Sequence, residues 1–235
     1  MLEVNDLHVN YGLFEAVKGI SLKVQQNETV ALLGPNGHGK STILRAISGL
    51  IKPRSGTITF NEKKITQLKP PEIVKMGIIQ VPEGGHLFPE MTVRENLMLG
   101  AYTPAAWKQR EVNLHKVLEI FPNLRDKMSR LCLNLSGGER RAVAVGRGLM
   151  SSAKLLMLDE PSLGLSPLLG QEVMRGIKNI RATGISILLV EENTRYIREL
   201  ADRIYLIEQG KVALQGEKNE VLENSYIKKA YLGVL

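Results

Sequence analysis

A continuous apolar stretch that leads directly into a glycine-rich turn is the feature that most constrains the fold. Val30 to Leu33 contains no polar residue, and the glycine-rich segment Gly34 to Ser41 follows without a spacer. Strands that are apolar on both faces are typical of parallel sheets, which are covered on both sides. Helical periodicity then extends from Ser41 to Leu50. The pattern predicts a buried parallel strand, a tight turn and a helix.

Further strands and helices alternate along the chain. Mainly apolar runs recur at Leu155 to Leu158 and Ile185 to Val190. Between these runs, the apolar residues from Leu168 to Arg181 are spaced as in a helix. Buried strands that alternate with helices predict a parallel α/β sheet with right-handed crossovers. The spacing from Val93 to Met150 is mainly helical, which predicts a helical insertion. We therefore expect a core of about 1–82 and 153–235, with a helical part of about 83–152, in one domain.

Three other segments have the pattern of exposed or amphipathic strands. Residues 2–9 and 20–24 nearly alternate between apolar and polar, which predicts an N-terminal antiparallel layer. Residues 56–60 follow turn signals and are predicted to form an exposed edge strand. Residues 204–207 and 212–214 flank Gln209-Gly210, so we expect a closing hairpin there.

The composition excludes several classes of protein. Of the 235 residues, 43% are hydrophobic and 23% are charged, which are globular values. The longest unbroken apolar runs have four residues, whereas a membrane-spanning helix needs roughly 20. The single cysteine, Cys132, permits no internal disulfide, and the N-terminus lacks the pattern of a signal peptide. We expect a cytosolic location.

A net charge of +7 favours anionic partners. Basic residues are scattered, and aromatic residues make up only 5% of the chain, so no basic and aromatic platform for nucleic acid is present. Nucleic-acid binding is therefore not expected.

Gly34 to Ser41 matches G-x-x-x-x-G-K-[ST] in the required context, between a strand and a helix. Glycines let backbone N–H groups converge on phosphate oxygens, and the following helix adds the positive end of its dipole. Lys40 is predicted to reach the β- and γ-phosphates, and the Ser41 hydroxyl to bind Mg²⁺. His38 is expected to be exposed and to have no direct role. The alternative is an ordinary glycine-rich turn.

Two further segments contain residues that are suited to catalysis or to anion binding. Leu155 to Leu158 ends in Asp159 and Glu160, at the sheet edge where ligands bind. Asp159 is predicted to hold Mg²⁺ and Glu160 to orient or deprotonate the attacking water, although Asp-Glu-Pro could merely cap the next helix. Ser136 and Glu139 form a predicted capping box. Because a capping box does not need Gly137-Gly138, these glycines indicate a second anion site.

In this order, the phosphate loop, the LSGGE segment at Leu135 to Glu139 and the LLMLDE strand at Leu155 to Glu160 resemble the ATP-binding subunits of ATP-binding-cassette (ABC) transporters. The resemblance covers essentially the whole chain. It implies a RecA-like phosphate-loop NTPase with an antiparallel β layer and a helical subdomain. Its implied cofactors are ATP and Mg²⁺. The implied nucleotide contacts are Tyr11 (stacking on adenine), Val17, Gly34, Pro35, Asn36, Gly37, His38, Gly39, Lys40, Ser41, Thr42, Ser136, Gly137, Gly138 and Glu139.

The resemblance also implies partners and a location. Two subunits would pair head to tail, with each ATP held between the phosphate loop of one and the Ser136-Gly137-Gly138 backbone of the other. The second subunit would be the same chain or a related cassette. Transmembrane permease subunits would convert closure into transport, and a solute-binding protein would act indirectly. The chain would lie peripherally on the cytoplasmic face of the membrane.

Departures from the family pattern define the expected catalytic set. Glu83 replaces the usual glutamine that touches Mg²⁺ and water, and we retain it as a catalytic and metal-binding residue. Glu192 stands where relatives have a histidine that contacts the γ-phosphate. We expect Glu192 to be protonated, turned away or bridged by water, so that hydrolysis depends mainly on Glu160 and Lys40. Leu165 replaces an aspartate of the loop that joins the subunits.

The segments VPEG, PSLGLSP, VEEN and KAYLG are similar to the branched-chain amino-acid importer branch. Gly85-His86 departs from that branch, and Arg140-Arg141 is similar to lipopolysaccharide-export ATPases. Urea importers share much of the pattern. The sequence is also compatible with a soluble ABC ATPase that acts on nucleic acid, or with a nucleotide-binding regulatory module without catalysis.

Overall fold

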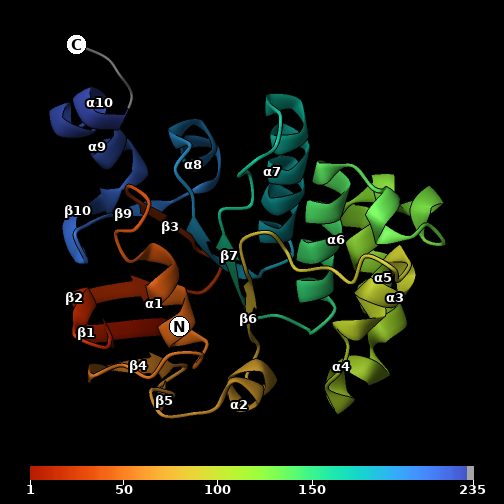
Figure 1. Cartoon of the computed structure of the whole chain (residues 1–235), viewed down its shortest axis with the longest axis horizontal. Coiled ribbons are helices and arrows are strands. Elements are labelled where there is room, and N and C mark those ends of the chain that lie inside the picture. Colours follow the sequence, from red (N-terminus) through yellow and green to blue (C-terminus); the bar gives the residue numbers. More distant parts are fainter. Residues whose placement is uncertain (232–235) are drawn as a thin grey trace. The chain divides into compact units, whose positions relative to one another are not determined.

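The structure is a computed structural model that describes residues 1–231. The chain forms two compact units. Unit 1 comprises residues 1–73 and the chain from residue 186 onward, and unit 2 comprises residues 74–185. Figure 1 labels most of the helices and strands of both units.

Unit 1 contains the predicted antiparallel layer. Strands β1 (Leu2–Tyr11) and β2 (Phe14–Val24) pair antiparallel, as expected from their alternating pattern. Strand β4 (Ser55–Phe60) pairs with the other edge of β1, and the sheet order is β2-β1-β4-β5. Leu2 and Val4 are buried, and after a register shift the same alternation resumes with the buried Leu7 and Val9. The alternation therefore reflects one covered face.

The edge position predicted for residues 56–60 is wrong at one end of the strand. The two-residue strand β5 (Lys63–Lys64) pairs with Thr59 and Phe60, so β4 lies between β1 and β5. Asn61 and Glu62, with φ of 47° and 67°, form the tight turn that folds the chain back. Positive φ at both central residues is typical of a two-residue hairpin.

Unit 1 also contains the strand that precedes the glycine-rich turn. Strand β3 (Thr29–Leu33) is buried at every position and lies parallel to both β8 (Ser186–Val190) and β9 (Arg203–Glu208). Strand β10 (Lys211–Glu217) pairs antiparallel with β9, which confirms the predicted closing hairpin. Parallel neighbours on both sides explain why β3 has no polar face.

Helices cover these strands in unit 1. They are α1 (Lys40–Ile47), α8 (Thr194–Leu200), α9 (Lys218–Glu223) and α10 (Ser225–Tyr231), while α2 (Pro70–Lys75) begins in this unit. Leu33, Ile204, Ile197, Leu222 and Ile227 form part of one buried cluster from β3, β9, α8, α9 and α10. The C-terminal helices therefore share a buried core with β3, the strand that leads into the phosphate loop.

Unit 2 contains a parallel strand pair and most of the helices. Strands β6 (Ile78–Val81) and β7 (Leu155–Asp159) pair in parallel. The predicted helical stretch consists of α3 (Val93–Leu99), α4 (Pro104–Lys108), α5 (Arg110–Ile120), the 3-10 helices η1 (Pro122–Lys127) and η2 (Cys132–Asn134), and α6 (Gly137–Leu149). Helix α7 (Pro167–Arg181) follows β7 and has a Ser166 cap.

Unit 2 begins at residue 74 and ends at residue 185, while the division into subdomains at about residues 82 and 153 stays a prediction. Strands β6 and β7 belong to unit 2 together with the helices. They pair with each other, and α6 packs on both of them. The apolar run Leu155 to Leu158 identified β7 as a strand, whereas β6 was not predicted from the sequence. Which helix these strands pack against is decided by contacts between distant parts of the chain.

A polar cluster on β1 and β2 predicts a pH dependence of stability. His8 Nδ1 lies 2.8 Å from Glu15 Oε1, and His8 Nε2 lies 3.2 Å from Asp6 Oδ1. The hydrogen bond to Glu15 raises the pKa of His8 above its ordinary 6.5, against an opposing effect of burial. The bond to His8 lowers the pKa of Glu15 below its ordinary 4.5.

The direction of the pH dependence of stability follows from the pKa shifts of His8 and Glu15. A raised His8 pKa stabilises the fold fully below pH 6.5, and this stabilisation is lost as pH rises through the folded pKa. We expect His8→Gln to lower the melting temperature at pH 6 by no more than about 3 °C and to leave it nearly unchanged at pH 9. Thermal unfolding at both pH values measures this. A larger loss at pH 9 than at pH 6 would contradict the assignment.

Candidate nucleotide-binding site

The glycine-rich turn joins β3 to α1 in unit 1. Gly34 has φ of 148°, and a Cβ there would lie 2.1 Å from the backbone oxygen of Ile207. Gly39, the N-cap of α1, has φ of 100°, and a Cβ there would lie 2.7 Å from the backbone oxygen of Ala16. Positive φ and the close approach of two neighbouring chain segments both require glycine at these positions.

The N-terminus of α1 is suited to an anion. Gly39 offers no side-chain cap, and the first turn of the helix contains no acidic residue. The first N–H groups of a helix have no acceptor within the helix, and they form the positive end of its dipole. A phosphate is the ligand that such a helix start binds when a glycine-rich loop precedes it.

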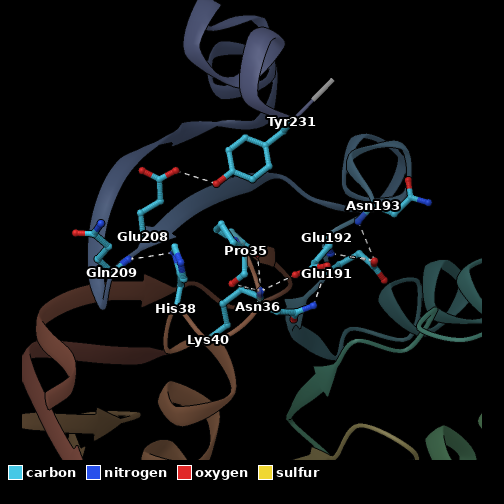
Figure 2. A network of polar contacts seen from close by, with 11 residues as sticks. Pro35, Asn36, His38, Lys40, Glu191, Glu192, Asn193, Glu208, Gln209 and Tyr231 are labelled. Atoms are coloured by element: carbon cyan, nitrogen blue, oxygen red, sulfur yellow. Dashed lines mark hydrogen bonds and ion pairs between the residues drawn. The ribbon is translucent and has the colours of Figure 1, made fainter. Parts of the chain in front are cut away.

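Lys40 lies at the centre of the turn. Its side chain is 3% exposed, and Nζ donates hydrogen bonds to the backbone oxygens of Gly34 at 2.5 Å and Pro35 at 3.0 Å. Nζ also lies 3.2 Å from Glu192 Oε1, in the network that Figure 2 shows. A buried ammonium group is tolerated only when it is paired in this way.

The Glu192 side chain departs from one of the expected arrangements. The Glu192 carboxylate points toward the phosphate loop, where Oε1 pairs with Lys40 and Oε2 accepts a hydrogen bond from Asn36 Nδ2 at 3.3 Å. It is therefore not turned away. Glu192 follows β8, and β8 lies beside β3 in the sheet, so the parallel pairing brings the ends of both strands to one edge.

The exposure predicted for His38 is wrong. His38 is half-buried, and its Nδ1 accepts a hydrogen bond from the Gln209 N–H at 3.2 Å. Its backbone oxygen accepts another from the Gly210 N–H, also at 3.2 Å. The turn between β9 and β10 therefore lies against the phosphate loop. Only this long-range pairing, which leaves no local signal, decides the environment of His38.

Tyr11 and Val17 differ in accessibility. Tyr11 is 44% exposed, and its hydroxyl lies 3.4 Å from Thr42 Oγ1, so the side chain reaches α1 and stays partly accessible. Val17 is fully buried, so we interpret its side chain as packing support for the phosphate loop. Stacking of Tyr11 on adenine stays a prediction.

A contact between α10 and β9 lies near the loop and was not predicted. The Tyr231 and Tyr226 hydroxyls donate to Glu208 Oε1 at 2.8 and 2.7 Å. Burial, and then the bond to Glu208, raise the pKa of Tyr231. Glu208 directly precedes Gln209, which contacts His38 (Figure 2). Of the KAYLG segment, Leu232-Gly233 lies outside the described residues.

Unit 2 contains the two carboxylates at the end of β7. Asp159 and Glu160 are only 4% and 5% exposed. Glu160 has φ of 45°, in the left-handed region that a non-glycine residue adopts at a cost of about 1–3 kcal/mol. Such conformations concentrate at functional sites. The strand-end position predicted from the sequence is confirmed, while the strained backbone of Glu160 has no signal in the sequence.

The LSGGE segment forms the predicted capping box in unit 2. Ser136 Oγ accepts from the Glu139 N–H at 3.3 Å, and the Glu139 carboxylate accepts from the Ser136 N–H at 2.8 Å. Glu139 also pairs with Lys127. Burial raises the pKa of Glu139, but the bonds to Lys127 and Ser136 outweigh it, and the net direction is downward. Helix geometry leaves the N–H groups of Gly137 and Gly138 without an acceptor within α6.

Glu83 is exposed on a loop of unit 2 that α6 holds in place. Arg147 of α6 donates to the backbone oxygens of Gly85 at 2.8 Å and His86 at 2.9 Å. The buried Asn96 of α3 exchanges hydrogen bonds with the backbone of Phe88, at 3.0 Å each. Arg147 and Asn96 are thus positioning residues that the sequence did not reveal.

The candidate residues are divided between the two units. Unit 1 holds Tyr11, Val17, Gly34, Pro35, Asn36, Gly37, His38, Gly39, Lys40, Ser41, Thr42 and Glu192. Unit 2 holds Glu83, Ser136, Gly137, Gly138, Glu139, Asp159 and Glu160.

The magnesium ligands predicted from the sequence come from both units, Ser41 from unit 1 and Asp159 and Glu83 from unit 2. Ser41, Asp159 and Glu83 offer oxygen atoms, which Mg²⁺ prefers. Within residues 1–231, no group of three or more His, Cys, Asp or Glu side chains could hold a metal by itself. Because Mg²⁺ is usually held by one or two carboxylates together with phosphate oxygens, the chain does not need such a group.

Comparison with known proteins decides the family. The family model described as ABC transporter matches residues 17–163, which include the phosphate loop, the LSGGE segment and the end of β7. The chain belongs to the ABC transporter family. As a member, it is an ATP-binding subunit that hydrolyses ATP.

Two relatives and one solved structure illustrate the match of this ABC subunit. The high-affinity branched-chain amino acid transport ATP-binding protein BraG of Pseudomonas aeruginosa is 37% identical over 99% of this chain and 100% of its own length. The probable branched-chain amino acid transport ATP-binding protein LivF of Archaeoglobus fulgidus is 36% identical, with both chains fully covered.

The crystal structure of the ADP conformation of MJ1267, an ATP-binding cassette of an ABC transporter, superimposes with a TM-score of 0.86 and 28% identity. It covers 99% of this chain and 98% of that one. The match confirms the predicted phosphate-loop NTPase fold. Among residues 1–231 of this ABC subunit, no helix has the length and apolar character that crossing a membrane requires.

Proposed function

We propose that this chain hydrolyses ATP to energise the import of branched-chain amino acids by a membrane transporter. The observation that carries the ATPase part is the buried Lys40, held within a loop that requires glycine at Gly34 and Gly39. The cargo is inferred from the relatives BraG and LivF and from the segments VPEG, PSLGLSP and VEEN.

The residues have distinct roles in the proposed reaction. Lys40 and the loop N–H groups bind the phosphates and neutralise their charge. Ser41, Asp159 and Glu83 would hold Mg²⁺, which polarises the phosphate oxygens when it is bound. Glu160 accepts a proton from the attacking water or orients it. Its near-complete burial and its φ of 45° support a carboxylate held in one orientation.

The second anion site requires a partner subunit in this proposal. Gly137 and Gly138 are the first two residues of α6, directly after the N-cap Ser136. Their N–H groups would contact the nucleotide bound by another subunit. Tyr11 would stack on the adenine. ATP would then close a head-to-tail pair of this chain with itself or with a related cassette, and hydrolysis would let the pair reopen.

Partners and location follow from the same proposal. Permease subunits would convert closure into transport, and a solute-binding protein would deliver the amino acid to them. The chain would associate peripherally with the cytoplasmic face of the membrane. The net charge of +7 supports contact with anionic headgroups.

Uptake measurements test the cargo. Deleting the gene is expected to reduce uptake of radiolabelled leucine severalfold, and the wild-type gene, but not Lys40→Ala, should restore it. Labelled urea uptake and lipopolysaccharide transport in the same strains test the other two cargos. Normal leucine uptake alongside sustained ATPase activity of the purified chain would contradict the cargo but not the enzyme.

Two other functions make different predictions. A regulatory module without catalysis would bind ATP but show no sustained phosphate release. A soluble ABC ATPase that acts on nucleic acid would retard DNA in a gel at physiological salt. We expect phosphate release and no retardation.

A further inference from the structure

One acidic side chain engages two groups of the phosphate loop at once. Glu192 Oε1 lies 3.2 Å from Lys40 Nζ, and Glu192 Oε2 accepts from Asn36 Nδ2 at 3.3 Å. Lys40 and Asn36 come from the loop after β3, and Glu192 comes from the segment after β8. Figure 2 shows the carboxylate between them. The Glu192 carboxylate therefore links two residues of the phosphate loop, Lys40 and Asn36, and is not an isolated ion pair on the surface.

The backbone around Glu192 is held independently of this bridge. Glu191 is 3% exposed, and its Oε1 accepts from the N–H groups of both Glu192 and Asn193 at 3.0 Å. Asn193 in turn caps α8 by accepting from the Arg195 N–H at 3.0 Å. The Glu192 side chain itself is 39% exposed. Rotation about its side-chain bonds can therefore release the bridge without moving the loop.

The chemistry of the bridge is that of phosphate recognition. Ammonium and amide N–H groups are donors, and a carboxylate offers them two anionic oxygens, as a terminal phosphate would. A phosphate-loop lysine reaches the β- and γ-phosphates. Glu192 and a γ-phosphate would thus compete for the same donor, and two anions a few ångströms apart also repel each other.

We propose that Glu192 is a nucleotide-discriminating residue, whose carboxylate occupies phosphate-loop donors that a γ-phosphate needs and so disfavours ATP relative to ADP. The inference depends on the proposed nucleotide-binding function. A diphosphate would contact Lys40 through its β-phosphate alone, and it lacks the terminal group whose charge the Glu192 carboxylate opposes. A triphosphate binds only after the Glu192 carboxylate has been displaced from Lys40 and Asn36. Its apparent affinity is therefore the intrinsic affinity multiplied by the fraction of molecules in which the carboxylate is displaced.

Binding measurements with Glu192→Gln test this inference. The variant keeps the side-chain shape and removes the charge. Isothermal titration with a magnesium-bound, non-hydrolysable ATP analogue and with MgADP is expected to show the triphosphate dissociation constant falling about tenfold or more, and the ADP constant changing less than about threefold. The shift in the ATP constant should shrink at high salt, because the side chain is partly exposed.

Glu199→Gln is the matched control. Glu199 lies on α8, is 53% exposed and pairs with Arg195, away from the loop, so this substitution changes the net charge equally. It should leave both constants unchanged. Glu192→Ala is the second variant, and it should favour ATP in the same direction.

The outcomes separate the inference from the proposed function. If both Glu192 variants keep the wild-type ratio of ATP to ADP affinity, or tighten both nucleotides equally, the discriminating role is overturned. If Glu199→Gln reproduces the selective effect, general charge explains it and the role is also overturned. If the wild-type chain binds neither nucleotide, the proposed function fails instead.

Discussion

Replacing Lys40 with alanine is expected to lower steady-state ATP hydrolysis by at least about a hundredfold. The ammonium group is the buried cation of the loop, and it is the group that neutralises developing charge on the transferred phosphate. Its loss also leaves the Glu192 carboxylate beside the loop without its lysine partner, which adds repulsion toward a phosphate. Phosphate release at saturating MgATP measures the effect.

Lys52→Ala provides the control for this prediction, because Lys52 is an exposed lysine outside the loop. It removes one positive charge and should leave turnover near the wild-type value. A Lys40→Ala chain that folds normally by circular dichroism and still turns over ATP at the wild-type rate would contradict the placement of the active site.

Replacing Glu160 with glutamine is expected to reduce turnover by at least about a hundredfold while nucleotide binding persists. Glutamine keeps the shape of a side chain that is 5% exposed but cannot accept the proton of the attacking water. The bound nucleotide should then persist and stabilise the closed pair. We expect dimers in MgATP, measured by light scattering on a sizing column, and phosphate release near the background.

Glu119→Gln on the exposed face of α5 is the matched control, and it should behave as wild type in both assays. Near-normal hydrolysis by Glu160→Gln would refute its role as the base. A variant that binds MgATP but stays monomeric, alone and with its natural counterpart subunit, would refute the nucleotide-bridged pair.

Local sequence patterns predicted the elements that hold the site. Val30 to Leu33 became β3 because only a strand covered on both faces has apolar residues at every position. Gly34 and Gly39 marked the turn because neighbouring backbone leaves no room for a Cβ. The Ser136 and Glu139 capping box was predicted because its hydrogen bonds span only three residues.

Contacts between distant segments could not be predicted in this way. His38 was misplaced because its partner, Gln209, comes from the turn of a hairpin 171 residues later. Arg147 holds the loop at Gly85 across 62 residues. Tyr231 reaches Glu208 only because α10 packs back on the strands of unit 1.

The chemistry of this protein could be predicted from the order of its residues, since motif spacing and hydrophobic period depend on residues within a few positions of one another. Which anion meets Lys40 is a property of the folded chain. It depends on the register of β3 beside β8, which brings Glu192 to the end of the phosphate loop, 152 residues away from Lys40 in the chain. Local periodicity contains no information about such pairing, because it arises from burial and hydrogen bonding between strands that are remote in sequence.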